Sequence, residues 1–328
     1  MNPLHTSAKL PTDVPALVEH LEVPEQRVVQ GHDMTFLAPV FGQVISDGGL
    51  ILLQNSLGWG SVNNPGGHIQ SSGRCFNATL QAPGGVVQLA SAENCLVIGR
   101  KVIIHEAVKC QIFAHSVQLG TAAACMIAGR DISIQASKAY KHEPSVITMV
   151  VPELSALDHE IEDHETGMAG MRASVDALGA RIQAFKANDD LANYLSIRAK
   201  LRAGMLTLSD EQNQVFLKMG ERLGDATTAL ETAVAERNPL VKGLNSCMAR
   251  VQTLREEQAA RLAACFCKIK RVEGETIVRK LLETHDDADL SMIDLPKIPK
   301  ILFRNDASLH FLCAVHEGTV NWCAGQGR

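Results

Sequence analysis

The chain has 328 residues and carries 31 basic against 36 acidic side chains, a net charge of −5. This balance gives no electrostatic reason to expect a nucleic-acid partner, and no stretch approaches the ~20 apolar residues that a transmembrane helix needs. Aromatic residues make up only 4% of the chain, which favours narrow repetitive cores and coiled coils over an ordinary globular core.

The first residues resemble no targeting segment. Met1 to Val18 contains three prolines and lacks a basic stretch followed by an apolar run, so we expect no signal peptide. The nine cysteines are an odd number, which fits reduced thiols in the cytoplasm better than a disulfide framework. We expect residues 1–41 to form a partly ordered leader or cap.

A repeat of 15 residues runs through the first half of the chain, from Leu80 to Ala139. Written in blocks of 15 from Leu80, the sequence aligns without a gap, and each of the last three blocks begins with a cysteine. The aligned columns are Cys95, Cys110 and Cys125; Val87, Val102, Val117 and Ile132; Leu89, Ile104, Leu119 and Ile134; Ala92, Ala107, Ala122 and Ser137; and the small residues Gly84, Gly99, Ala114 and Gly129.

This repeat predicts a parallel β-helix. Within each block the apolar residues alternate, which is the period of a strand. A unit this short has no room for a crossover helix, so each strand must stack on the strand one turn earlier, ~4.8 Å away. We expect the β-helix to span residues 42–150, with less regular turns over 42–79, where Gly- and Asn-rich corners separate short apolar runs.

The pattern changes at Val151-Pro152, and proline suits the first turn of a helix. From there apolar residues recur at spacings of three and four, which is typical of a coiled coil. Only His164 interrupts this seam. The seam residues are Leu154, Leu157, Ile161, Met168, Met171, Val175, Leu178, Ile182 and Phe185.

A second helix is predicted from Ser209, a suitable N-cap residue, to about Ile269, with Asn238-Pro239 as a kink or break. Gly204 and its neighbours offer the turn between the two helices. The prediction is therefore a long antiparallel coiled-coil hairpin over residues 151–272, with arms of roughly 50–60 residues and a length of about 80–90 Å.

Residues 273–328 read as strands that return to the β-helix. Short apolar segments are separated by Gly318 and by an acidic stretch from Asp286 to Asp289. The hairpin would then be an insertion into the β domain. The expected strands are Thr276–Val278, Ile301–Phe303, Leu309–Val315 and Thr319–Trp322.

In this order of parts the chain resembles the flagellar assembly protein A family of bacteria. The matching segments are Gly99 to Ile104 (GRKVII), Gly129 to Ile134 (GRDISI) and the heptads from Leu154 to Phe185. The resemblance covers roughly residues 42–328. It implies a right-handed β-helix with a coiled-coil insertion, and a cytoplasmic, self-associating scaffold that serves flagellar or polar assembly.

The cysteines are candidates for metal or redox chemistry. On stacked turns, however, in-register side chains point the same way, and free cysteine packs as a small hydrophobe, so we interpret Cys95, Cys110 and Cys125 as a core ladder. Cys265 and Cys267 are predicted to lie on a helix, where residues i and i+2 face different sides and chelate poorly.

The triplets Asp158-His-Glu160 and Asp163-His-Glu165 could clamp a metal, since His159 and Asp163, like Glu160 and His164, are spaced i, i+4. No third protein ligand is evident in the sequence. The alternative is a solvated helix face, with His164 as a polar seam residue that sets the register.

The sequence gives less support to an enzymatic function. The Gly58-Trp-Gly60 segment lacks the GxGxxG spacing, and no P-loop or GxSxG motif is present. A β-helix acyltransferase or carbohydrate-acting enzyme remains the alternative function, with His105 and His115 as its only candidate bases and Glu106 and Asp131 as scattered carboxylates. The period of 15 is not a multiple of the six-residue acyltransferase repeat.

We therefore expect a mainly β plus α protein without enzymatic activity and without catalytic, cofactor-binding or metal-binding residues. Its expected role is a homo-oligomeric scaffold with a protein partner on the coiled coil or on an end of the β-helix. We expect no nucleic-acid partner and no insertion into a membrane.

Overall fold

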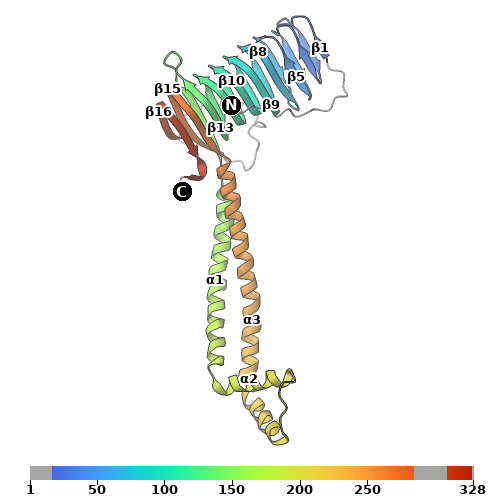
Figure 1. The fold of residues 1–328 in the computed structure, drawn as a ribbon, viewed down its shortest axis with the longest axis vertical. Helices are drawn as coiled ribbons and strands as arrows, with labels where there is room; N and C mark the ends of the chain where they lie inside the picture. The colour runs from blue at the N-terminus through green and yellow to red at the C-terminus, as the bar shows by residue number, and fades with distance from the viewer. Residues whose placement is uncertain (1–16, 284–308, 327–328) are drawn as a thin grey trace. The chain divides into compact units, whose positions relative to one another are not determined.

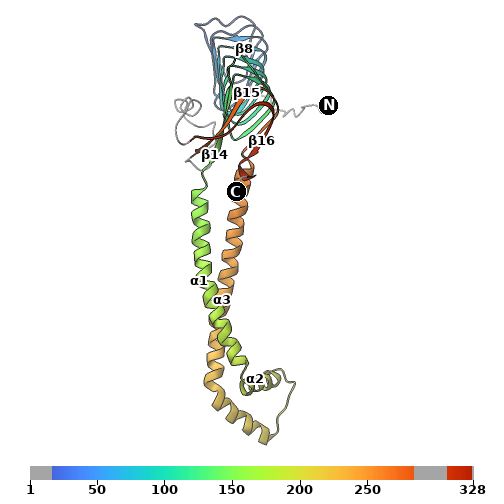
Figure 2. The ribbon, with the colours of Figure 1, turned by 90° about the vertical axis from the view of Figure 1, so that its left-hand side faces the viewer.

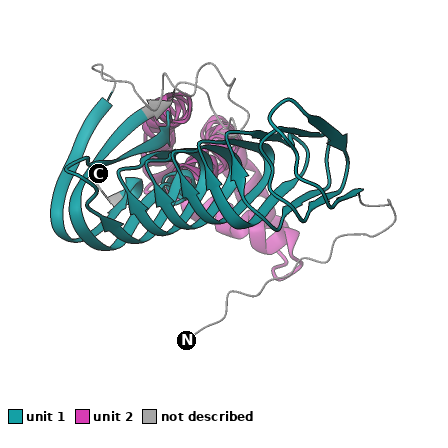
Figure 3. Ribbon diagram, turned by 90° about the horizontal axis from the view of Figure 1, so that it is seen from above, with its two compact units in different colours: residues 1–153, 259–328 teal, residues 154–258 magenta. Residues whose placement is uncertain are grey.

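The computed structural model describes residues 17–283 and 309–326, and it divides into two compact units (Figure 3). Unit 1 consists of Met1–Glu153 and Ala259–Arg328, and unit 2 of Leu154–Gln258. Unit 1 is rich in strands and unit 2 is helical. Among the described residues, no helix is both long and apolar enough to cross a membrane.

Unit 1 is a parallel β-helix of about eight turns, whose strands stack in register along its length (Figure 1). All pairings between its strands are parallel, except that β15 and β16 pair in antiparallel fashion. The strands are β1 (Leu17–Glu19), β2 (Val28–Gly31), β3 (Met34–Phe36), β4 (Gln43–Ser46), β5 (Leu50–Leu53), β6 (Leu57–Gly58), β7 (Ser61–Asn63), β8 (His68–Phe76), β9 (Thr79–Glu93), β10 (Leu96–Val108), β11 (Gln111–Ala123), β12 (Met126–Gly129), β13 (Asp131–Lys138), β14 (Ser145–Pro152), β15 (Phe266–Glu283) and β16 (Leu309–Cys323).

The predicted columns are confirmed by the strand register. Val87, Val102, Val117 and Ile132 stand opposite one another, and the columns through Leu89 and Ala92 continue in the same way. Every member of these columns is buried. Alternating residues thus fill a narrow core of stacked aliphatic side chains, as the strand period requires.

One predicted column needs correction. Gly99 pairs with Ala82 and not with Gly84, because the register shifts beside it. The residues between Ala82 and Val86 form a bulge opposite the single residue Arg100. An extra pair of residues in one turn cannot be detected when blocks of equal length are aligned, because the apolar alternation resumes after the bulge.

The β-helix also begins earlier than residue 42. Strands β1 and β3 pair with each other, and β2 pairs with β4, so residues 17–41 already belong to its first turns. Met34 and Phe36 are among its fully buried side chains. The expected leader is therefore part of the β-helix from Leu17 onward.

One corner of the β-helix needs a left-handed backbone in successive turns. Trp59, Asn77, Asn94, Lys109 and Ala124 have φ values of 59°, 50°, 52°, 52° and 51°. The last three directly precede the three cysteines of the predicted ladder. Because this conformation is costly for residues with a Cβ but tolerated by asparagine, the two asparagines are the best suited of the five. Their side chains also join, since Asn94 Nδ2 donates to Asn77 Oδ1 at 2.6 Å.

The helical unit is inserted inside a single turn of the β-helix. Strand β14 stacks on β12, with Val146 opposite Met126. The first half of β15 stacks on β13, with Phe266 opposite Asp131. Together β14 and the first half of β15 complete one turn, although the whole helical segment separates them in the sequence.

The returning strands are longer than predicted. The second half of β15 stacks on β14, and β16 then pairs with β15 in antiparallel fashion along its length. The predicted segments Thr276–Val278, Leu309–Val315 and Thr319–Trp322 are parts of these two strands. The predicted strand Ile301–Phe303 lies outside the described residues.

Unit 2 and its boundary region contain three helices, α1 (Ser155–Lys186), α2 (Asp189–Arg202) and α3 (Asp210–Ala263) (Figure 2). The helical segment is shorter than the predicted range 151–272 at both ends. Pro152 is the last residue of strand β14, and Ile269 lies in strand β15. The 54 residues of α3 agree with the predicted arm length, and Pro239 lies inside this helix without ending it.

The first predicted arm is divided. Helix α1 ends at Lys186, and Asn188 caps α2 by accepting a hydrogen bond from the Leu191 amide at 3.1 Å. The predicted turn is confirmed, with Gly204 at φ 68°. The predicted N-cap of α3 is confirmed as well, since the Ser209 hydroxyl accepts from the Gln212 amide and Gln212 Oε1 accepts from the Ser209 amide, a capping box.

Candidate functional site

The three cysteines of the predicted ladder lie in the core of the β-helix. Cys95, Cys110 and Cys125 are all buried, and each thiol donates to the carbonyl two residues earlier at 3.3–3.4 Å. The column continues from Cys125 through Ser145 to Thr276, whose hydroxyl donates to the Gly274 carbonyl at 3.2 Å. Small donors therefore suit this column because each corner leaves a carbonyl directed into the core.

The pKa values of the three ladder thiols shift in opposite directions, because hydrogen bonds with Cys110 lower the pKa of Cys95 and of Cys125. Hydrogen bonds with Cys125 and Cys95, together with burial, raise the pKa of the Cys110 thiol above its ordinary value. Burial likewise raises the pKa of Cys75 to about 11. A thiol is reactive as its thiolate, so the raised pKa disfavours nucleophilic chemistry at Cys75 and Cys110, and the burial of all three ladder thiols favours a packing role.

Cys265 and Cys267 were predicted to lie on a helix, and this prediction is wrong. Helix α3 ends at Ala263, and Cys267 lies in strand β15. Both cysteines are buried in the core of the β-helix. Burial raises the pKa of Cys267 to about 12, so this pair also serves packing.

The two acidic triplets on α1 make contacts with α3. Glu160 accepts from Arg250 at 2.6 Å, Glu165 pairs with Arg255 at 2.5 Å, and Asp158 accepts from Gln258 at 2.6 Å. His164 Nε2 lies 3.9 Å from Glu160. Within residues 17–283 and 309–326, no cluster of three or more His, Cys, Asp or Glu side chains has a geometry that could hold a metal.

The two candidate histidines do not converge. His105 lies on β10 beside Gly120 of β11, where an added Cβ would come within 3.1 Å of His105 Nδ1. His115 lies on β11 in a different column, directly before Ser116, whose hydroxyl donates to Asp131 at 2.9 Å. The structure therefore does not bring these two bases onto one site.

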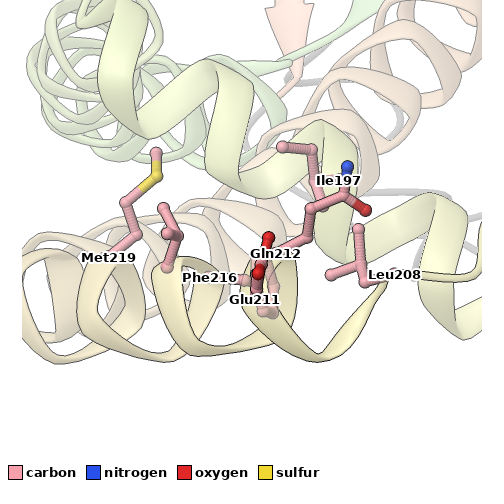
Figure 4. Close-up of a pocket in the computed structure, with 7 residues that line it drawn as sticks. Ile197, Leu208, Glu211, Gln212, Phe216 and Met219 are labelled. Carbon is pink, nitrogen blue, oxygen red and sulfur yellow. The ribbon is translucent and has the colours of Figure 1, made fainter.

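Sequence reasoning missed an apolar groove at the turn that follows α2 (Figure 4). The groove has a volume of about 380 Å³. Figure 4 shows its walls, with Ile197 contributed by α2, Leu208 by the turn before α3 and the other labelled side chains by the start of α3. The lining residues are Ile197, Leu208, Glu211, Gln212, Val215, Phe216 and Met219.

An aromatic pair joins the two helices beside the groove. Tyr194 of α2 stacks on Phe216 of α3 with ring centroids 4.9 Å apart, and Phe216 also lines the groove. Met205 in the turn is 80% exposed and Val215 is 63% exposed. The cluster of apolar residues around Gly204 was visible in the sequence, but a helical period alone does not show which of them stays exposed.

The first turn of the β-helix forms a second exposed surface. Among the described residues, β1 pairs only with β3 and β2 only with β4. The outer edges of both strands are thus free of strand partners within the described part of the chain. Val18 on β1 and Val28 on β2 are 45% and 48% exposed. At the other end, the antiparallel strand β16 covers one edge of β15.

Comparison with known proteins finds no match to this chain among family models, curated proteins or solved structures.

Proposed function

We propose that this chain is a non-enzymatic, self-associating scaffold. In this proposal a right-handed β-helix joins a second copy through its N-terminal end, and the helical unit is an antiparallel coiled-coil arm that docks a protein partner. The resemblance to the flagellar assembly protein A family supports a role in the cytoplasm of bacteria, in flagellar or polar assembly.

The outer edge of the first turn, which has no strand partner among the described residues, carries this proposal. Unpaired strand edges readily pair with another chain, and natural β proteins usually protect them with charge, proline or a covering segment. Here the exposed side chains at the edge include the apolar Val18 and Val28. Two copies related by a two-fold axis could join these edges in antiparallel fashion, which is the commonest symmetry of homodimers.

Contacts within the helical unit support the coiled-coil arm. Ile161 of α1 clusters with Val251 and Leu254 of α3, and further along α1 Ile182 clusters with Leu223 and Leu230. Higher residue numbers on α1 thus face lower numbers on α3, as in an antiparallel pair. Ile161 and Ile182 are positions of the predicted heptad seam.

The groove between Ile197 and Phe216 is the proposed docking site for the partner. An amphipathic helix laid into a groove is a common mode of protein recognition. Glu211 on the rim makes no ion pair among the described residues. The partner helix is therefore expected to present an apolar face with a basic residue beside it.

Light scattering coupled to size exclusion tests the self-association. The wild type should elute with at least twice the 35.4 kDa mass of one chain. The double variant Val18→Lys/Val28→Lys places charges on the unpaired edge and should elute as a monomer. A strictly monomeric wild type at high concentration would contradict the proposal.

Two control variants separate this edge from other exposed apolar positions. Met248→Lys replaces a side chain on α3 that is 47% exposed, much like Val18 and Val28. Val215→Lys alters only the groove of the helical unit. Both should keep the wild-type mass. Equal loss of association in all the variants would show that the N-terminal edge is not the interface.

The assembly role is tested separately by gene neighbourhood. Flagellar genes beside the gene for this chain would support the role that the resemblance implies. A neighbourhood devoted to an unrelated process would remove that role and leave the scaffold proposal standing.

A further inference from the structure

A polar cavity opens beside the left-handed corner of the β-helix, near its N-terminal turns. Its volume is about 430 Å³, which lies within the range of ~300–1,000 Å³ found for small-molecule sites. Strands β4, β7 and β9, the corners before them and Glu25 in the turn before β2 contribute its walls. The side chains that matter for the argument are Glu25, Gln43, Trp59, Ser61, Asn77 and Thr79.

Trp59, which lines this cavity, combines an unfavourable backbone conformation with an exposed side chain. It occupies the same left-handed corner column as Asn77 and Asn94, where the conformation disfavours a bulky side chain. Its side chain does not gain burial in exchange, because Trp59 is 66% exposed. The largely exposed indole gains little burial to offset this strain, and strained backbone positions cluster at functional sites.

The walls of the cavity offer neutral hydrogen-bonding groups. Gln43 and Asn77 supply amides, and Ser61 and Thr79 supply hydroxyls. The bond from Asn94 fixes the Asn77 amide, whose nitrogen has no partner among the described residues. Such amides and hydroxyls both donate and accept, so they match a ligand that is itself rich in hydroxyl groups.

The charge of the lining excludes other common ligands. Among the described residues no Lys, Arg or His lines the cavity, and the one charged residue of the described lining is the acidic Glu25. Phosphates and carboxylates would meet no counter-charge there. A ligand that stacks on one aromatic face and hydrogen-bonds to neutral groups must itself be neutral and must have a flat apolar side.

From these observations we infer that the cavity beside Trp59 binds a pyranose ring of a neutral carbohydrate. The C–H groups on one face of the ring pack on the electron-rich indole, and the ring hydroxyls exchange hydrogen bonds with Gln43, Asn77, Ser61 and Thr79. The site binds sugar without cleaving it, since Glu25 is the only carboxylate that the described part of the chain contributes to the lining, and glycoside hydrolysis needs a pair. This inference is independent of the proposed self-association.

The test uses the full-length chain with Trp322→Phe. Since the sequence has two tryptophans, this leaves Trp59 as the only one. Cellohexaose, chitohexaose and maltohexaose are titrated separately while the Trp59 fluorescence is recorded, and binding is measured again by calorimetry. At least one of these sugars should give a saturable change with a Kd of ~10 µM to 1 mM.

Trp59→Asn is the decisive variant. It installs the residue that the same corner column already uses twice, so it should fold at least as stably as the parent protein. Sugar binding measured by calorimetry should nevertheless weaken by about 10-fold or more, because the stacking surface is lost. Phe311→Ala removes another exposed aromatic, on β16, and should leave sugar binding unchanged.

Three results would overturn the inference. The first is the absence of binding by all three sugars up to ~10 mM. The second is equal sugar binding by Trp59→Asn and its parent. The third is saturable binding of choline, a probe for cation–π recognition by Trp59, without binding of any sugar.

Discussion

Ser137 Oγ and Thr276 Oγ1 lie 2.7 Å apart in the buried core, although they are 139 positions apart in the sequence. Ser137 precedes the helical insertion and Thr276 follows it. Because the Thr276 hydroxyl also bonds to the Gly274 carbonyl at 3.2 Å, its single proton is directed there, and Ser137 donates to Thr276. This pair joins the two segments of the β-helix across the insertion.

Thr276→Val should destabilise the chain by about 1–3 kcal/mol, because it leaves the buried Ser137 hydroxyl without its acceptor. Urea denaturation followed by circular dichroism measures the change. The double variant Ser137→Ala/Thr276→Val should cost less than the sum of the two single variants, since no orphaned hydroxyl remains. Thr319→Val, at an exposed position of β16, is the control and should change little. Strict additivity would contradict the bond.

Ala124→Gly should stabilise the β-helix by up to about 1 kcal/mol, since Ala124 adopts a φ of 51° that glycine tolerates without strain. The matched control is the neighbouring Ala123→Gly, in strand β11, where glycine should destabilise. Thermal unfolding of the two variants beside the wild type makes the comparison. A lower Tm for Ala124→Gly would show that the left-handed corner is absent.

Stability should fall as the pH rises above about 9. In the unfolded chain Cys75 and Cys267 ionise near their ordinary pKa of 9.0, whereas in the folded chain burial raises the pKa values to about 11 and about 12. The unfolded state then binds fewer protons, so the free energy of unfolding decreases by up to about 1.4 kcal/mol per pH unit for each thiol. The loss due to Cys75 should end near pH 11 and that due to Cys267 near pH 12.

Denaturation curves between about pH 8 and 11 measure this slope. The variant Cys75→Ala/Cys267→Ala should show a shallower decline than the wild type, whatever its stability at neutral pH. Cys247→Ala, at a partly exposed position of α3, should keep the wild-type slope. An unchanged slope in the double variant would contradict the burial of these two thiols.

Exchange of the charges of Glu160 and Arg250 tests the register of the proposed coiled coil. Either Glu160→Arg or Arg250→Glu alone should lower the stability of the helical unit by roughly 0.2–1 kcal/mol, because both side chains are partly exposed. The double exchange should recover most of the loss in low salt and less of it in high salt. Recovery would be absent if α1 and α3 did not face each other at these positions.

The regular part of the fold could be predicted because one period controls it. The apolar positions of Val102 and Ile104 recur 15 residues later at Val117 and Leu119, and the strand register pairs each residue with its counterpart. The limit appears at Ile269, which fits a helical spacing with the residues before it but lies in β15. A single apolar residue satisfies both periods, so only the pairing with β13 decides between helix and strand.

The break between α1 and α2 had a local signal that the heptad pattern concealed. Asn188-Asp-Asp190 combines an N-cap residue with an acidic first turn, but the apolar spacing around it continues. The cavity at Trp59 could not be predicted from the sequence. The left-handed corner column contains Trp, Asn, Lys and Ala, so its members share a backbone conformation and no side-chain chemistry.

Site-specific cross-linking of Val18 tests the central claim, that two copies meet at the N-terminal edge. The partly exposed Cys247, Cys313 and Cys323 are replaced by serine, which leaves only buried cysteines. Val18→Cys is then introduced, and a short bismaleimide is added. We predict a covalent species of twice the 35.4 kDa chain mass for Val18→Cys and none for Met248→Cys. Monomer alone in the Val18→Cys sample, or an equal dimer yield from Met248→Cys, would contradict the account.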